Sequence, residues 1–370
     1  MCHTNPNGPA KAAIAGSLAS TMTLRRAAIT AALAVWALFA PPAGRAVAAE
    51  AGTPNSAVVF AYNRFGEDQS PGSSIRIEQF EAHLEELTTG SYAVLPLPAI
   101  LDALKAGKPL PDRTVAITVD DATRSFFTQA WPRLKAAGLP VTLFVATDPI
   151  DRGAGTHMSW AELRQLQAAG VTIGGLGATT LSLVDSPPDE ARAELRRMAD
   201  RLQAELGRRP TLFAYPEGEY SHALQDLAGQ QGFAAAFGQQ SGVLHPRADL
   251  RALPRFVMNE SYGSVERFQL AANALPLPVS DLTPDDPLLT VNPPPLGFTV
   301  SGEVGDLSRL ACFASGQGRT RLERIADDRI EVRIADPFPP GRARVNCTLP
   351  TAEGRWRWFG VQFVIPDDED

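Results

Sequence analysis

Between Ala57 and Pro278 the chain alternates short, continuously apolar runs with segments of helical periodicity. The apolar runs, rich in β-branched and aromatic residues, are Val58–Tyr62, Val115–Val119, Val141–Ala146, Val171–Ile173, Thr211–Tyr215 and Ala234–Phe237. The helical segments between them include Ile77–Leu87, Phe126–Ala137, Trp160–Ala169 and Asp189–Leu206. Strands that are apolar on both faces and separated by helices predict an α/β fold with a parallel sheet covered by helices. A segment of roughly 220 residues suits one (β/α) barrel, although periodicity alone does not distinguish a barrel from an open sheet.

The pattern changes after Pro278. Residues 279–296 are rich in proline, which is typical of a linker. Beyond Gly297 the helical periodicity disappears, and short strand-like runs such as Phe298–Val300 and Trp356–Ile365 follow one another. We therefore predict a barrel domain over residues 50–278, a linker over 279–296 and a small all-β, sandwich-like domain over 297–370. Within the last of these runs, Trp356 and Trp358 share one strand face, where they would form a sandwich core or, if exposed, a platform for sugar rings.

The first 49 residues have the features of a secretory signal peptide. Arg25 and Arg26 precede an apolar stretch over residues 27–40, and small residues at 46–49 provide a cleavage site. Met22 would give a more compact leader than Met1 and is an alternative translation start. The mature protein is expected to be secreted and periplasmic. In that oxidising compartment Cys312 and Cys347, the two cysteines beyond the leader, are expected to form a disulfide.

Charge and hydropathy narrow the class of partner. The chain has 34 Lys and Arg against 41 Asp and Glu, a net charge of −7, whereas phosphate binding needs clustered positive charge. Nucleic acid is therefore not an expected partner. No uninterrupted apolar run is long enough for a membrane-spanning helix.

Two adjacent carboxylates end one of the apolar runs. In Thr118-Val-Asp120-Asp121-Ala122 the acids follow a predicted buried strand and open a loop. Neighbouring positions at a strand end can direct a general base and a metal ligand into one cleft, and they can equally cap the following helix.

This segment is one of several motifs that occur in the same order as in a known protein family. Thr118–Ala122 resembles the T-F-D-D-G motif of the polysaccharide deacetylase, or NodB-homology, family (carbohydrate esterase family four), and Phe213–Tyr220 resembles the family's third motif. The similarity extends over about Val58–Met258. It implies a deacetylase-type (β/α) barrel that hydrolyses N-acetyl groups of aminosugar polysaccharides or oligosaccharides. It also implies a divalent metal, usually zinc, held by one aspartate and two histidines in an H-x-x-x-H motif.

Carried over by position, Asp120 matches the family's general base and Asp121 its metal-binding aspartate. The third motif, which includes Tyr215 and Pro216, implies a backbone N–H that helps to hold the oxyanion. Glu217 takes the place of a tyrosine common among relatives, and is the second candidate catalytic residue of the altered site.

The second motif departs from the family. Leu176 and Thr180 occupy the two histidine positions, and Asn63 lies where close relatives usually carry histidine. Leucine offers no donor, and a neutral hydroxyl is a poor substitute for imidazole, so zinc is expected to be absent or weakly bound. Asp121 is then the residual ligand.

The remaining histidines do not restore a zinc site. His83, His157, His222 and His245 match no ligand position of the family and are expected to be packing or loop residues. Asp120, Asp121 and Glu217 would suit Mg²⁺ or Ca²⁺ better than zinc if they formed a site of carboxylates alone.

Three functions are left open. The chain is a polysaccharide de-N-acetylase with an altered site, or a catalytically silent relative that binds glycan or a partner through the retained cleft. A lesser alternative is a glycosidase that uses Asp120 and Glu217 as its two carboxyl groups. If the cleft is retained, Asn63, Leu176, Thr180, Tyr215 and Pro216 are its expected lining residues.

Overall fold

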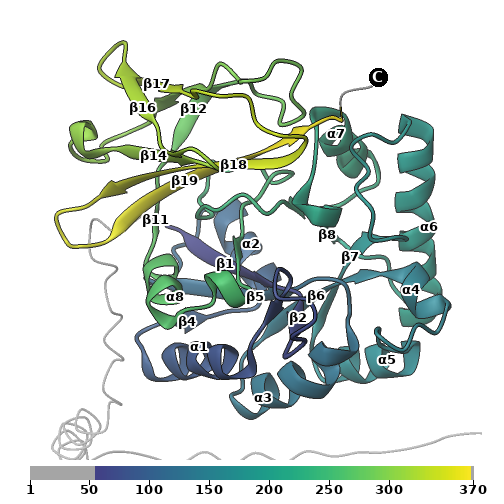
Figure 1. Cartoon of the computed structure of the whole chain (residues 1–370). Helices are drawn as coiled ribbons and strands as arrows, with labels where there is room; N and C mark the ends of the chain where they lie inside the picture. The colour runs from purple at the N-terminus through teal and green to yellow at the C-terminus, as the bar shows by residue number, and fades with distance from the viewer. Residues whose placement is uncertain (1–54, 368–370) are drawn as a thin grey trace, which may run out of the picture. The chain divides into compact units, whose positions relative to one another are not determined.

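The computed structural model describes residues 55–367, which lie in one compact unit (Figure 1). The signal peptide predicted over residues 1–49 lies outside the described residues. We refer to residues 55–274 as the barrel region and to residues 275–367 as the β region.

The barrel region is built on the predicted parallel sheet. Its strands are β1 (Ala57–Tyr62), β5 (Thr114–Val119), β6 (Val141–Ala146), β7 (Thr172–Gly177), β8 (Leu212–Ala214), β9 (Ala235–Phe237) and β10 (Phe256–Val257), hydrogen-bonded in the order β10-β1-β5-β6-β7-β8-β9. Strand β4 (Ala93–Val94) pairs beside β5. Leu253 bridges to Phe237 on β9, and Phe256 pairs with Phe60 on β1, so one short segment reaches both edges of the sheet. The sheet therefore closes into the predicted (β/α) barrel instead of remaining open.

Helices cover the outer face of the sheet (Figure 1). They are α1 (Ile77–Thr89), α3 (Trp131–Ala136), α4 (Thr147–Asp151), α5 (Trp160–Ala168), α6 (Pro188–Leu206), α7 (His222–Gln230) and α8 (Val265–Ala272), whereas α2 (Leu97–Lys105) packs against the barrel interior. Helix α3 is preceded by a π-helical turn, Phe126–Ala130, so the helix predicted over 126–137 begins with a wider turn. Two short pairing strands, β2 (Arg64–Phe65) and β3 (Ser74–Ile75), lie between β1 and α1.

Alternate residues of each barrel strand belong to two separate cores. Val59 and Phe144 face the barrel interior, whereas Phe60 and Leu143 pack in the layer between the strands and the helices. Ile100 of α2 joins the interior cluster, so this helix closes one end of the barrel. Burial on both faces explains why these strands read as continuous apolar runs.

The β region consists of two sheets around a third core. One sheet has the order β11-β19-β18-β14-β15, made of β11 (Leu275–Pro276), β19 (Trp356–Ile365), β18 (Gly341–Pro350), β14 (Ala311–Ala314) and β15 (Gly318–Arg319). The other has the order β12-β13-β17-β16, made of β12 (Val279–Thr283), β13 (Gly297–Val300), β17 (Arg329–Arg333) and β16 (Arg321–Arg324). Phe298, Val332, Val345 and Phe363 from both sheets meet in the core, as the sandwich prediction requires.

The proline-rich residues 279–296 do not form the predicted linker. Strand β12 pairs with β13 from Val279 to Thr283, and Leu289 and Leu296 are buried in the core of the β region. Proline fixes φ at a value that extended edge strands also adopt, and the leucines between the prolines supply apolar surface. The composition of a linker and that of an edge segment are therefore alike.

Two further features of the β region bear on the predictions. Cys312 on β14 lies directly opposite Cys347 on β18, and the two form the predicted disulfide in the buried core. Trp358 is buried against Phe256 of the barrel, with ring centroids 5.2 Å apart, whereas Trp356 remains 37% exposed. Neither tryptophan lies in the sandwich core, because the sheet that carries them turns this face toward the barrel region. Among residues 55–367, no helix combines the length and the apolar character needed to cross a membrane.

Candidate functional site

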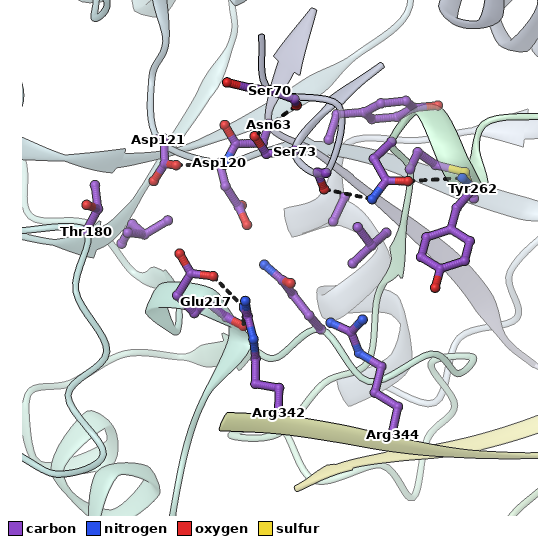
Figure 2. A pocket seen from close by; sticks show the side chains of 18 residues that line it. Asn63, Ser70, Ser73, Asp120, Asp121, Thr180, Glu217, Tyr262, Arg342 and Arg344 are labelled. Atoms are coloured by element: carbon purple, nitrogen blue, oxygen red, sulfur yellow. Dashed lines mark hydrogen bonds and ion pairs between the residues drawn. The ribbon is translucent and has the colours of Figure 1, made fainter. Parts of the chain in front are cut away.

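A cleft of about 610 Å³ opens at the carboxyl ends of the barrel strands (Figure 2). Six residues singled out from the sequence line it: Asn63, Asp120, Asp121, Leu176, Thr180 and Glu217. They lie at or just beyond the ends of four strands, β1, β5, β7 and β8, and the carboxyl ends of parallel strands meet on one side of a barrel. Residues from motifs that are far apart along the chain therefore lie together on one wall of the cleft.

Unusual backbone geometry directs these side chains. Asp121, Ala122 and Glu217 all have positive φ, at 75°, 52° and 58°. Left-handed backbone is costly for residues other than glycine and is concentrated at sites where the surrounding structure enforces it. Here it occurs on the two loops that carry the acidic residues of the cleft.

The side chain of Asp120 is fully engaged by Arg255. The guanidinium donates from Nη1 to Oδ1 at 2.7 Å and from Nη2 to Oδ2 at 2.9 Å, and Nε donates to the carbonyl oxygen of Gly238. Arg255 is completely buried, and Asp120 is 3% exposed. The ion pair neutralises a charge that would otherwise lie unpaired in the barrel interior. Arg255 belongs to no motif noted in the sequence, because a single arginine in an apolar run has no distinctive pattern.

Asp121 has a different environment. Nδ2 of Asn63 donates to its Oδ2 at 2.6 Å. Burial raises the pKa of Asp121 to about 6, and repulsion from Asp120 and Glu217 adds to the effect that the Asn63 hydrogen bond opposes. Oδ1 of Asn63 is itself buried without a hydrogen-bond partner. The cleft therefore contains one carboxyl that titrates near neutral pH and one unsatisfied amide oxygen.

The donor set does not fit the zinc that the family resemblance implies. Leu176 is 2% exposed and packs in the barrel interior cluster, and Thr180 offers only a neutral hydroxyl beside Asp121. Within residues 55–367, no group of three or more His, Cys, Asp or Glu is arranged to hold a metal ion. Zinc sites normally take at least three protein ligands, mostly nitrogen and sulfur, so Asp121 alone is insufficient.

Two ion pairs also oppose a site made of carboxylates alone. Both oxygens of Asp120 accept from Arg255, and Glu217 pairs with Arg342. A hard cation would have to displace these guanidinium groups to gain more than one ligand. The same pairs disfavour the glycosidase alternative, since each of its two candidate carboxylates already accepts hydrogen bonds from a guanidinium group.

The histidines lie elsewhere. None of the four described histidines lines the cleft. His83 is buried in packing, with Nδ1 near the hydroxyl of Tyr62 and Nε2 near the carbonyl oxygen of Gly263, and burial lowers its pKa to about 4. His157 shares an isolated bridge with Thr123, and His222 begins α7. His83 therefore has a packing role, as predicted, whereas His222 lies in the first turn of a helix and not on the predicted loop.

Two predicted cleft residues are misplaced. Tyr215 is 1% exposed, stacks on Tyr220 and donates its hydroxyl to the carbonyl oxygen of Arg251, away from the cleft. Pro216 is buried and is also absent from the lining. Strand residues alternate faces, so Ala214 of β8 faces the interior and its neighbour Tyr215 faces the helix layer.

The β region contributes the opposite wall of the cleft. Arg342 and Arg344 of β18 line it, and Arg342 forms an ion pair with Glu217 and contacts Glu219 at 3.4 Å (Figure 2). Gln362 of β19 donates to the carbonyl oxygen of Gly218 at 3.0 Å. These residues lie over 100 positions beyond Glu217 in the sequence, and local patterns cannot reveal such a contact. The sequence does show that Arg342 and Arg344 alternate with apolar residues, which places both arginines on one face of a strand.

Comparison with known proteins supports the resemblance. Residues 107–236 match the family model described as polysaccharide deacetylase. The YxkH protein of Bacillus subtilis (strain 168), whose assigned name is that of a polysaccharide deacetylase, is 25% identical over 189 residues, which cover 50% of this chain and 67% of that protein. The poly-β-1,6-N-acetyl-D-glucosamine N-deacetylase of Escherichia coli (strain K12) is 22% identical over 265 residues, which cover 60% of this chain and 39% of that protein.

The fold is shared with solved structures. The deacetylase PplD of Streptococcus pyogenes, solved in complex with acetate, superposes with a TM-score of 0.55 at 19% identity. The superposition covers 60% of this chain and 99% of PplD. At this identity the likeness concerns the fold alone.

Proposed function

The barrel region of this chain belongs to the polysaccharide deacetylase family, and from that premise we propose that its cleft binds an aminosugar polysaccharide without hydrolysing it by the zinc mechanism. The substrate class follows the name of the Escherichia coli relative, which acts on a polymer of N-acetylglucosamine. In this proposal the chain keeps the cleft of the family and lacks the family's zinc chemistry.

One observation carries this proposal. The two positions where the family resemblance requires histidine are occupied by Leu176 and Thr180, and both lie in the same cleft as Asp121. The residue at the base position is affected as well, because Asp120 uses both oxygens to bind Arg255. A metal-held water is then not available, and the residue at the family's base position is already paired with a guanidinium group.

The remaining lining suits sugar. Ser70, Ser73, Gln239 and Asn259 supply hydroxyl and amide groups, and Tyr262 supplies a ring that is 43% exposed. Hydroxyl-rich sugar rings are bound by such neutral donors and acceptors together with an aromatic face. A carbohydrate can therefore be held where it is not cleaved.

Binding and hydrolysis can be measured separately. We expect N-acetylglucosamine oligomers to bind the purified protein in isothermal titration calorimetry, and we expect no acetate release with zinc added or with EDTA. Asn259→Ala should weaken binding, since Nδ2 of Asn259 braces the loop through the carbonyl oxygen of Gly72. EDTA-sensitive acetate release from these oligomers by the unmodified protein would contradict the proposal.

A second candidate is a de-N-acetylase with an altered, metal-independent site. The pKa of Asp121, raised to about 6, favours it, because a carboxyl that exchanges protons near neutral pH can serve as a general base. Acetate release that rises with pH through about 6, survives EDTA and disappears in Asp121→Asn would support this candidate over the silent one.

We also propose that the mature protein is exported. The leader predicted over residues 1–49 and the disulfide between Cys312 and Cys347 support an oxidising compartment. Expression of the full chain in a Gram-negative host, followed by fractionation and N-terminal sequencing, tests this. We expect periplasmic protein that begins near Glu50, and cytoplasmic protein with an intact N-terminus would contradict it.

A further inference from the structure

Arg344 is a cation of the cleft without an acidic partner. Its Nε donates to Oε1 of the neutral Gln362 at 2.8 Å, and no ion pair joins it to any acid of residues 55–367. Its neighbour Arg342, in contrast, is occupied by Glu217 and Glu219. The side chain of Arg344 points into the cavity from β18 (Figure 2).

A second unpaired guanidinium lies behind the same wall. Arg267 of α8 stacks over the ring of Tyr262, with its Cζ 4.7 Å from the centroid, and its buried Nε has no hydrogen-bond partner. Tyr262 lines the cleft together with Arg344. Burial and the neighbouring Arg342 and Arg267 lower the pKa of Arg344, and Tyr262 and Glu217 oppose this effect. Two guanidinium groups, those of Arg344 and Arg267, thus lie near Tyr262 without an ion pair to any acid in the described part of the chain.

Such an arrangement is costly unless a ligand completes it. A partly buried guanidinium without a counter-ion loses hydration, and a second cation nearby adds repulsion. Its planar fork of donors matches a carboxylate in a bidentate geometry. Two acids of the cleft, Asp120 and Glu217, have guanidinium partners of their own, and Asp121 is hydrogen-bonded to Asn63.

From this geometry we propose that Arg344, backed by Arg267 and Tyr262, forms an anion subsite that takes a carboxylate carried by the sugar chain. The proposal rests on the proposed function and deepens it: the preferred ligand is an acidic glycan that carries carboxylates as well as N-acetylated aminosugars, not a neutral polymer. The β region then supplies specificity from its own wall of the cleft, opposite the wall that the barrel region builds.

Matched oligosaccharides test the proposal. The probes are a hyaluronan tetrasaccharide, which alternates N-acetylglucosamine and glucuronic acid, the same tetrasaccharide with its carboxyls reduced to alcohols, and chitotetraose. In calorimetry at low salt we expect the acidic form to bind roughly ten- to hundred-fold more tightly than its reduced form. Added NaCl should weaken the acidic form and leave the reduced form little changed.

Variants locate the effect. Arg344→Gln should abolish the preference for the acidic form, and Arg344→Lys should keep part of it, because it retains the charge without the fork. Arg309→Gln, at an exposed arginine of the β region outside the cleft, should keep it entirely. Thermal unfolding of each variant identifies any loss of fold. If a variant does not fold, the effect of NaCl on binding of the acidic and reduced forms by the unmodified protein tests the anion subsite instead.

The outcomes distinguish the two proposals. Equal affinity for the acidic and reduced forms overturns the anion subsite and leaves glycan binding intact. An undiminished preference in Arg344→Gln also overturns it. If none of the three oligosaccharides binds, both the subsite and the glycan-binding function are wrong.

Discussion

The carboxylate of Asp120 has a structural role in the barrel interior. It lies where the family resemblance expects a general base, and its two hydrogen bonds to Arg255 satisfy a fully buried guanidinium. Removing one partner of a buried pair leaves an uncompensated charge.

Asp120→Asn is therefore expected to destabilise the protein by about 3–5 kcal/mol in urea unfolding. The double variant Asp120→Asn with Arg255→Met should recover much of that loss, since it removes the stranded charge. Asp185→Asn, at an exposed acid, is the control and should change little. Equal effects of the single and double variants would mean that the pair does not act as a unit.

Asp121 is expected to make stability depend on pH. Its pKa is raised to about 6 in the folded protein, from an ordinary 3.8, so the ionised carboxylate is a cost that folding must overcome. This cost is absent below pH about 4, grows between about 4 and 6 and stays constant above that. Asn at this position keeps an oxygen that can accept from Asn63 and does not ionise.

Asp121→Asn should consequently gain roughly 2–3 kcal/mol more stability at pH 7 than at pH 4, relative to the unmodified protein. Urea unfolding at both pH values measures the difference. A gain that is equal at both pH values would instead reflect the greater tolerance of Asn for left-handed backbone.

Zinc affinity is expected to depend on the two residues that replace histidine. The unmodified protein should be purified without zinc, since Asp121 is one ligand where three are needed. Leu176→His combined with Thr180→His should create zinc binding, because both positions line the cleft beside Asp121. Thr180→His alone supplies two ligands and is the control.

Elemental analysis and calorimetry with zinc measure this directly. The affinity of the double variant is limited by the hydrogen bond from Asn63 to Asp121 and by the cost of an imidazole at the buried Leu176 position. Stoichiometric zinc in the unmodified protein would show that ligands outside these positions complete a site.

At the scale of elements, the disulfide of the β region joins β14 to β18 across 35 residues of chain. Closing a loop of that size in the unfolded chain is worth about 3–4 kcal/mol in the chain-entropy account. Both cysteines are buried in the sandwich core, where a serine hydroxyl would replace an apolar contact, so the substitutions below use alanine.

Cys312→Ala with Cys347→Ala should lower the free energy of unfolding by about that 3–4 kcal/mol, and reduction of the unmodified protein should reproduce the loss. Thermal unfolding with and without dithiothreitol measures both. If dithiothreitol lowers the melting temperature of the double variant as much as that of the unmodified protein, the bridge is not the cause.

At the scale of the whole molecule, the cleft exists because the β region packs against the barrel region. Gly360 of β19 lies so close to the barrel that an added Cβ would be 2.3 Å from the carbonyl oxygen of Ser241. Trp358 packs on Phe256 beside this contact, and Arg355 pairs with Asp112 at 2.8 Å.

Gly360→Ala should force the two regions apart, destabilise the protein by at least about 1–3 kcal/mol and weaken glycan binding. Gly155→Ala, at an exposed glycine with open space around its Cα, is the matched control. Urea unfolding and calorimetry with the tetrasaccharides measure the two effects. Unchanged stability would mean that the contact at Gly360 is not tight in solution.

Local patterns predicted most of the elements. β6 and β19 have the bounds expected from their apolar runs, whereas the all-β segment, predicted to begin at Gly297, already begins at β11. β7 extends beyond the predicted run to Gly177, because its glycines and Leu176 fill the crowded interior without forming an apolar run. Periodicity records which faces are buried, so it succeeds where burial is local and regular.

Positions on the cleft wall were predicted with mixed success. Asp120, Asp121, Leu176 and Thr180 line one cleft because motif order fixes which strand each of them follows. Tyr215 failed by one residue, since its side chain lies on the opposite face of its strand. The sequence by itself thus determined the parallel sheet with its helices and the disulfide cysteines, because each depends on residue type and local spacing. The barrel and the replacement of the two histidines followed from the order of motifs shared with the family.

Only the tertiary structure decided that Arg255 pairs with Asp120 and that residues 279–296 pack in the β region. It also decided that β18 brings Arg342 and Arg344 to the cleft. These are contacts between residues more than 100 positions apart or choices between chemically similar environments. A contact of that kind depends on how strands are ordered and how two regions dock, and no local pattern of residues encodes it.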